Sequence, residues 1–151
     1  MTPPALTGTE WLVASNPRIY DADRAFAVLP EVNWSETSVG ITVGDVVSLY
    51  GTAPIQAITH RCVVTETDVP FGRRIDDARF WTDPVALADR RSRSWMRLRL
   101  VREFDEYERA LLSLEAMEDL GLNGAPQSRM RAPAAVSRLI DRVIRAASER
   151  R

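Results

Sequence analysis

The chain has 151 residues, of which 45% are apolar and 27% charged, with 20 basic and 21 acidic side chains. This length suffices for one domain with a substantial buried core, and the single cysteine, Cys62, excludes an intrachain disulfide. No run of roughly 18 apolar residues occurs, which excludes a transmembrane helix. The amino terminus lacks the basic and apolar regions of a secretory signal, so we expect a protein of a reducing compartment.

All twenty basic residues are arginines, and the chain contains no lysine. This excludes a Walker A phosphate loop, Schiff-base catalysis and a Ser–Lys dyad, because each of them requires a lysine. A Ser–His–Asp triad would have to use His60, the only histidine, and no serine stands in a nucleophile-elbow context. A zinc site would have to rely on carboxylates, which is unusual for structural zinc. The composition therefore favours no enzyme class, and we expect neither a metal nor a cofactor.

Charge is distributed unevenly along the chain. Residues 51–104 carry ten arginines and seven acids, whereas residues 105–120 carry one arginine and six acids. The most basic run is 90–102, with six arginines and no acid in thirteen residues. Such a run attracts phosphates over about 8 Å, one Debye length in physiological salt, even in a nearly neutral protein. A solvated face explains the run equally well, so charge alone does not establish nucleic-acid binding.

The first half of the chain predicts three strands and one helix. Residues 9–15 and 46–51 are rich in β-branched and aromatic side chains, which favour strands. Asp21 can cap a short helix over 22–29. Residues 55–67 predict a longer strand whose apolar positions alternate between two faces, with Ile58, Cys62 and Val64 on the same face.

The second half predicts a long loop, one more clear strand and helices. Residues 68–92 are rich in Asp, Pro, Gly and Arg and predict a loop with a short strand at 78–81. Apolar and polar residues alternate over 94–104, which predicts a strand. Ser113 can cap a helix, and Pro133 can open a final amphipathic one. About five strands and several helices without strict alternation favour an α+β fold with a curved sheet or small barrel.

Six motifs follow one another in a characteristic order. They are WLVASNP (11–17), the Asn33-Trp34 pair, GDVVSLYGTAPIQAI (44–58), HRCVVTETDVP (60–70), WMRLRL (95–100) and GLNGAPQSRMR (121–131). In this order they resemble the EVE domain of the PUA-like superfamily. The resemblance implies an α+β pseudo-barrel of about five to six mostly antiparallel strands with flanking helices. It also implies a flexible amino terminus (1–8), a single EVE domain (9–151) and no fused nuclease segment.

The same resemblance implies a function. EVE domains are related to the YTH readers of methylated adenine in RNA, and several bacterial members are linked to modified cytosine in DNA. We therefore expect a non-catalytic reader that inserts a flipped base, 5-methylcytosine first, into an aromatic pocket. A YTH-like reader of modified RNA is the alternative. A hydrolase related to ASCH domains is a further alternative, although the hydrolases of that branch use a lysine and this chain has none. Nucleic acid is the expected partner, with no membrane, in a cytoplasmic, nucleoid-associated protein.

The expected pocket combines aromatic walls with amide side chains. Extruding a base costs a few kcal/mol, which stacking on an aromatic ring offsets by ~1–3 kcal/mol. Trp34 is the preferred wall, because it lies in a predicted loop and resembles the cage tryptophan of YTH relatives. Core packing and turn formation are the structural alternatives for these residues. The expected pocket residues are Ser15, Asn16, Trp34, Tyr50, Gly51, Thr52, Trp81, Gln127 and Ser128.

Arginines beside the pocket are expected to hold the nucleic-acid backbone. The planar guanidinium can bind a phosphate with two hydrogen bonds. Arg142 and Arg145 face outward on the predicted last helix and should not contribute. The expected backbone contacts are Arg73, Arg74, Arg90, Arg91, Arg93, Arg129 and Arg131. The sequence does not indicate which base modification is bound, since burying one methyl group contributes only ~0.8 kcal/mol of transfer free energy.

Overall fold

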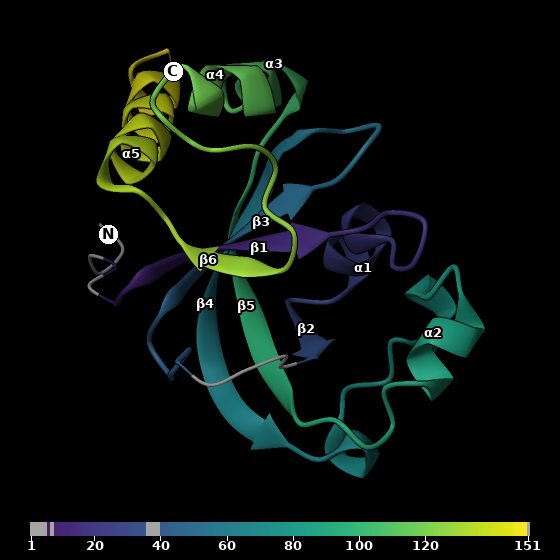
Figure 1. Ribbon diagram of the computed structural model, residues 1–151. Coiled ribbons are helices and arrows are strands. Elements are labelled where there is room, and N and C mark those ends of the chain that lie inside the picture. Colours follow the sequence, from purple (N-terminus) through teal and green to yellow (C-terminus); the bar gives the residue numbers. More distant parts are fainter. Residues whose placement is uncertain (1–5, 7, 36–39, 151) are drawn as a thin grey trace.

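The computed structural model describes residues 6, 8–35 and 40–150, so most of the expected flexible amino terminus lies outside the described residues. Six strands form one mixed sheet in the order β2-β5-β4-β3-β1-β6 (Figure 1). Only β1 and β3 pair in parallel, and the other pairs are antiparallel. The strands are β1 (Glu10–Ser15), β2 (Glu31–Ser35), β3 (Val46–Gly51), β4 (Ala57–Val69), β5 (Trp95–Glu103) and β6 (Arg129–Arg131).

Five α-helices accompany the sheet in the described chain, and most begin at a side chain that caps them. Asp21 accepts a hydrogen bond from Arg24 N, and Ser113 accepts one from Ala116 N, so both predicted caps are confirmed. The helices are α1 (Ala22–Val28), α2 (Pro84–Ala88), α3 (Glu106–Leu111), α4 (Leu114–Glu118) and α5 (Ala134–Glu149). No helix in the described ranges is long and apolar enough to cross a membrane.

The sheet buries apolar side chains on both faces. One core cluster joins the sheet to α1 through Phe26 and includes Val47 and Cys62. The other joins Tyr50 and Ile58 to α4 and α5, which lie together at one end of the molecule (Figure 1). The prediction that Ile58 shares a face with Cys62 is wrong. The register of β4 shifts against β3 and again against β5, and such bulges transfer the following side chains to the opposite face.

The sheet does not close into a barrel in the described chain. Its edge strands are β2, which pairs with β5, and β6, which pairs with β1 through only three residues. The α+β class and the mostly antiparallel sheet that we predicted are confirmed, whereas closure is not observed. The short β6 leaves little backbone that could pair with the opposite edge.

Two local predictions are also wrong. The Asn33-Trp34 pair lies in β2, where Trp34 is opposite Met96 of β5, and not in a loop. The predicted strand at 78–81 is absent from the described structure: Ala78–Phe80 form a 3-10 turn, and Trp81 forms one isolated bridge to Tyr20. The placement of Trp34 depends on long-range pairing with β5, which a short stretch of sequence does not reveal.

Candidate functional site

A cavity of about 530 Å³ lies where the two edges of the sheet approach each other. One side is built by residues 13 and 14 of β1 and by the loop 125–127 that precedes β6. The other side is built by residues 33–35 of β2. We call this space between β1 with the 125–127 loop and β2 the seam cavity.

Four aromatic side chains line one side of the cavity. Ring centroids are separated by 5.5 Å between Tyr20 and Trp34, 5.3 Å between Tyr20 and Trp81, and 6.0 Å between Trp81 and Trp95. Each pair meets edge to face, the arrangement that aromatic quadrupoles favour. We call these four residues the aromatic wall. Trp34 and Trp81 are half-buried, so part of each ring is available to a ligand.

One buried carboxylate holds this wall together. Asp77 has no exposed surface and accepts hydrogen bonds from the Tyr20 hydroxyl at 3.1 Å and from Trp81 Nε1 at 3.3 Å. It also accepts one from Arg74 Nη1 at 3.0 Å, and the Arg74 guanidinium lies 4.6 Å from the centroid of Trp95. Burial, and next the charge of Asp77, raises the pKa of Tyr20 well above its usual range. Sequence reasoning missed Asp77 and Tyr20, because neither stands in a recognisable motif.

The amide of Asn33 fixes the loop that carries Trp81. Its Nδ2 donates to the carbonyl of Ile75 at 2.8 Å, and its Oδ1 accepts from Ile75 N at 3.0 Å. Asn33 is 1% exposed, so these two bonds tie the loop to β2 in an environment with little competing water. The Asn-Trp pair thus combines an anchor with a cavity wall.

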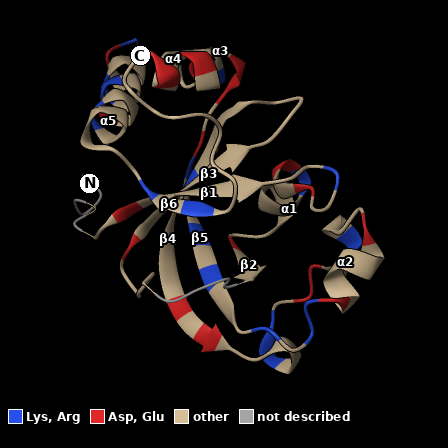
Figure 2. Ribbon diagram, viewed as in Figure 1, with Lys and Arg blue, Asp and Glu red and all other residues tan. Residues whose placement is uncertain are grey.

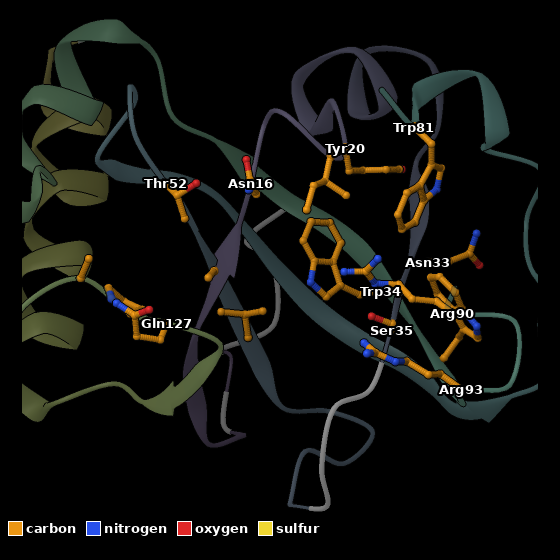
Figure 3. A pocket seen from close by; sticks show the side chains of 16 residues that line it. Asn16, Tyr20, Asn33, Trp34, Ser35, Thr52, Trp81, Arg90, Arg93 and Gln127 are labelled. Carbon is orange, nitrogen blue, oxygen red and sulfur yellow. The ribbon is translucent and has the colours of Figure 1, made fainter. Parts of the chain in front are cut away.

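Polar side chains face the aromatic wall across the cavity. Figure 3 shows Asn16, Thr52 and Gln127 on one side of the opening and Trp34 and Trp81 on the other. Asn16 Oδ1 accepts a hydrogen bond from Arg18 N at 2.9 Å, so the turn that we considered as an alternative role is present. This turn leaves the exposed Nδ2 of Asn16 as a donor for a ligand.

Two arginines of the basic run reach the cavity. Arg90 and Arg93 line it, and the guanidinium of Arg90 lies 5.7 Å from the centroid of Trp81 (Figure 3). Arg90 follows α2, and its Nη1 donates a hydrogen bond to the carbonyl of Ala86 at 2.6 Å, which holds the side chain in place. Arg91 is exposed and is absent from the lining, and its Nε donates to the Ala88 carbonyl.

The other expected backbone contacts lie elsewhere. Arg74 is buried by its contact with Asp77, and Arg73 forms an exposed ion pair with Glu66 at 2.9 Å. The guanidinium groups of Arg129 and Arg131 lie 5.0 and 5.6 Å from the ring centroid of Trp11. Figure 2 shows basic residues along β5 and β6 and acidic residues on α3 and α4.

Four of the expected pocket residues do not line the cavity. Tyr50 is 1% exposed and belongs to the second core, where burial, and next the charge of Glu118, raises its pKa. Gly51 makes room for Ile55 rather than for a ligand, because an added Cβ would lie 3.0 Å from Ile55 Cγ2. Two serines complete this set. Ser15 is buried beside a small separate hollow, and Ser128 is exposed with its carbonyl bonded to Ala14 N.

Neither a protein family nor a curated protein matches this sequence. Several solved structures, however, resemble this chain in fold. An ASCH protein from Zymomonas mobilis superposes with a TM-score of 0.60 over 89% of this chain and 94% of its own, at 10% identity. The chain therefore has the same fold as this ASCH protein.

Two further solved structures share this fold. A Pseudomonas putida protein gives a TM-score of 0.58 at 20% identity, covering 89% of this chain and 98% of its own. A hypothetical protein from Leishmania major gives 0.54 at 16% identity, covering 94% and 98%. These structures confirm the fold that the motifs indicated, and membership of the EVE branch stays a prediction.

Proposed function

We propose that this protein binds a nucleobase of a nucleic acid strand in the seam cavity, without catalysing a reaction. The observation that carries the proposal is the composition of the cavity. An aromatic wall faces amide side chains across about 530 Å³, and two arginines stand at its border. These are the groups that a base and its phosphate require: a stacking surface, hydrogen-bond partners for the edge, and cations.

The chemistry of each side supports this ligand over a peptide or a lipid. A base has two apolar faces and a polar edge, so it suits a cavity with one aromatic and one polar side. Gln127 can offer both a donor and an acceptor, and Asn16 can offer its Nδ2 as a donor. Arg90 and Arg93 can then bind the phosphates beside an extruded or single-stranded base.

Modified DNA is the first candidate ligand, with 5-methylcytosine as the base. This step rests on the six motifs that resemble EVE domains. Modified RNA is the second candidate, and both share the requirement for an unstacked base. The absence of lysine argues against the hydrolases of the ASCH branch that use one.

Matched oligonucleotides test the proposal. Duplex DNA, single-stranded DNA and RNA that differ only in one methyl group should be titrated by fluorescence anisotropy, with strand integrity checked afterwards. We expect preference for the methylated DNA and intact strands. Equal affinity for methylated and plain strands would contradict modified-base reading, and strand cleavage would contradict a non-catalytic role.

The variant Trp34→Ala tests the cavity itself. Loss of one stacking surface should weaken binding by about 1–3 kcal/mol, roughly 5- to 150-fold. Tyr107→Ala is a matched control, because Tyr107 is an exposed aromatic on α3, outside the cavity. A folded Trp34→Ala protein that binds like the Tyr107→Ala control would show that the base lies elsewhere.

A further inference from the structure

Three side chains distant in the sequence converge beside α1, outside the seam cavity. His60 of β4 places Nε2 3.3 Å from Asp23 Oδ1 of α1 and 3.7 Å from Glu103 Oε1 of β5. The three donor atoms all lie within 4.8 Å of one another. None of these residues lines the seam cavity, so the cluster is not explained by base binding.

The imidazole of His60 is buried, and one of its nitrogens lacks a hydrogen bond. The residue is 1% exposed, yet Nε2 makes no hydrogen bond of adequate geometry within the described chain. On the other side of the ring, Nδ1 lies 2.7 Å from Thr59 Oγ1. When Nδ1 carries the proton and donates it to Thr59, Nε2 presents a lone pair toward two carboxylates. That arrangement is favourable when a cation lies between the three groups.

We propose that His60, Asp23 and Glu103 form a zinc-binding site. One imidazole nitrogen and two carboxylate oxygens are a donor set that Zn²⁺ accepts at about 2.0–2.2 Å. Tetrahedral ligands at that distance are separated by roughly 3.3–3.6 Å, close to the observed spacing around His60. The contact between Thr59 and Nδ1 matches the outer partner that orients a metal-binding histidine.

The site is open on one side, as expected for zinc with three protein ligands. Asp23 and Glu103 keep 48% and 47% of their side chains exposed, so the metal can reach them from solvent. Both border a surface hollow of about 410 Å³ that also includes Asp105 and Glu106 at the acidic start of α3 (Figure 2). A fourth ligand, water or a small anion, can enter there.

Arg109 of α3 competes with the metal for the same carboxylates. Its Nη2 lies 2.8 Å from Asp23 Oδ1 and 3.7 Å from Glu103 Oε1. Zinc must therefore displace the guanidinium from Asp23 Oδ1. The competition yields a distinctive expectation, because removing the positive charge of Arg109 should strengthen zinc binding instead of weakening it.

Isothermal titration of the full chain with Zn²⁺, and absorption spectra with Co²⁺ as a coloured substitute, test the site. We expect one saturable site, with Asp23→Asn and Glu103→Gln each weakening the affinity at least about tenfold. Glu106→Gln is the matched control, since this acid borders the same hollow but is not one of the three ligands. Arg109→Gln should bind Zn²⁺ more tightly than wild type.

Two results would overturn the proposal. One is the absence of saturable binding by the wild-type chain, and the other is equal affinity of the Glu103→Gln and Glu106→Gln variants. His60→Gln should also weaken the visible d–d absorption of bound Co²⁺, but the histidine is buried and its variant can unfold. The exposed carboxylates therefore decide the outcome. The test does not depend on base binding, since no oligonucleotide is present.

Discussion

Removal of the Asp77 carboxylate should both destabilise the fold and loosen the aromatic wall. Asp77→Ala leaves three donors without their acceptor: the Tyr20 hydroxyl, Trp81 Nε1 and Arg74 Nη1. The side chain of Arg74 is only 9% exposed, so its charge would stay buried without a counter-charge. This uncompensated charge should account for most of the stability lost by the substitution.

The magnitude follows from these contacts. Breaking a buried ion pair by removing one partner costs about 3–5 kcal/mol. For a domain of this size, each kcal/mol lowers Tm by roughly 2–4 °C, so Asp77→Ala should lower it by about 6–20 °C. Asp77→Asn keeps an oxygen for Arg74 and Trp81, and the Tyr20 hydroxyl can accept a bond from the new amide. Asp77→Asn therefore keeps the hydrogen bonds but removes the counter-charge of Arg74, so it should destabilise the protein by about 1–2 kcal/mol less than Asp77→Ala does.

Thermal unfolding followed by far- and near-ultraviolet circular dichroism measures these effects. The near-ultraviolet signal of the native Asp77→Ala protein should decrease, because the rings of the wall lose their fixed orientation. Asp76→Ala is the matched control, since Asp76 is adjacent and exposed. A Tm for Asp77→Ala within about 3 °C of that control would refute the assignment of Asp77 as the anchor.

Two further expectations concern charge and pH. Replacing Arg90 and Arg93 by Gln should reduce the slope of log affinity against log salt by up to about 2. The control is a double variant with Arg142→Gln and Arg145→Gln on the exposed face of α5, which should leave the slope unchanged. Equal slopes for the two double variants would disprove that the cavity arginines bind the nucleic-acid backbone. Burial raises the pKa of Tyr20 in the folded protein. The free energy of unfolding is therefore unaffected by this group below the phenol pKa of the unfolded chain, about 10. Above that pH it should decline by about 1.4 kcal/mol per pH unit, because only the unfolded chain loses the proton. Urea unfolding of wild type and Tyr20→Phe at pH 9–11 should show the steeper decline in wild type, and parallel curves would contradict the burial of this phenol.

Local sequence was sufficient for most elements, because their determinants lie within a few residues. The strand 46–51 was predicted with the bounds observed for β3. The side chains of Asp21 and Ser113 each cap a helix by accepting a hydrogen bond from the backbone N–H three residues later, and that spacing is visible in the sequence. Trp34, a candidate from the sequence, lines the cavity, but its element was misjudged because β2 is defined by pairing with the distant β5.

The sequence by itself determined the α+β class, the helix caps, the absence of lysine chemistry and a set of aromatic, amide and arginine candidates. Only the tertiary structure decided which candidates meet. Tyr50 alternates with Leu49 along β3 and so faces the second core, and the approach of the sheet edges brings Trp34 opposite Gln127. Side-chain direction alternates with every residue of a strand, so one shift in register changes a site residue into a core residue. The cluster of Asp23, His60 and Glu103 likewise depends on pairing between segments that are far apart in the chain.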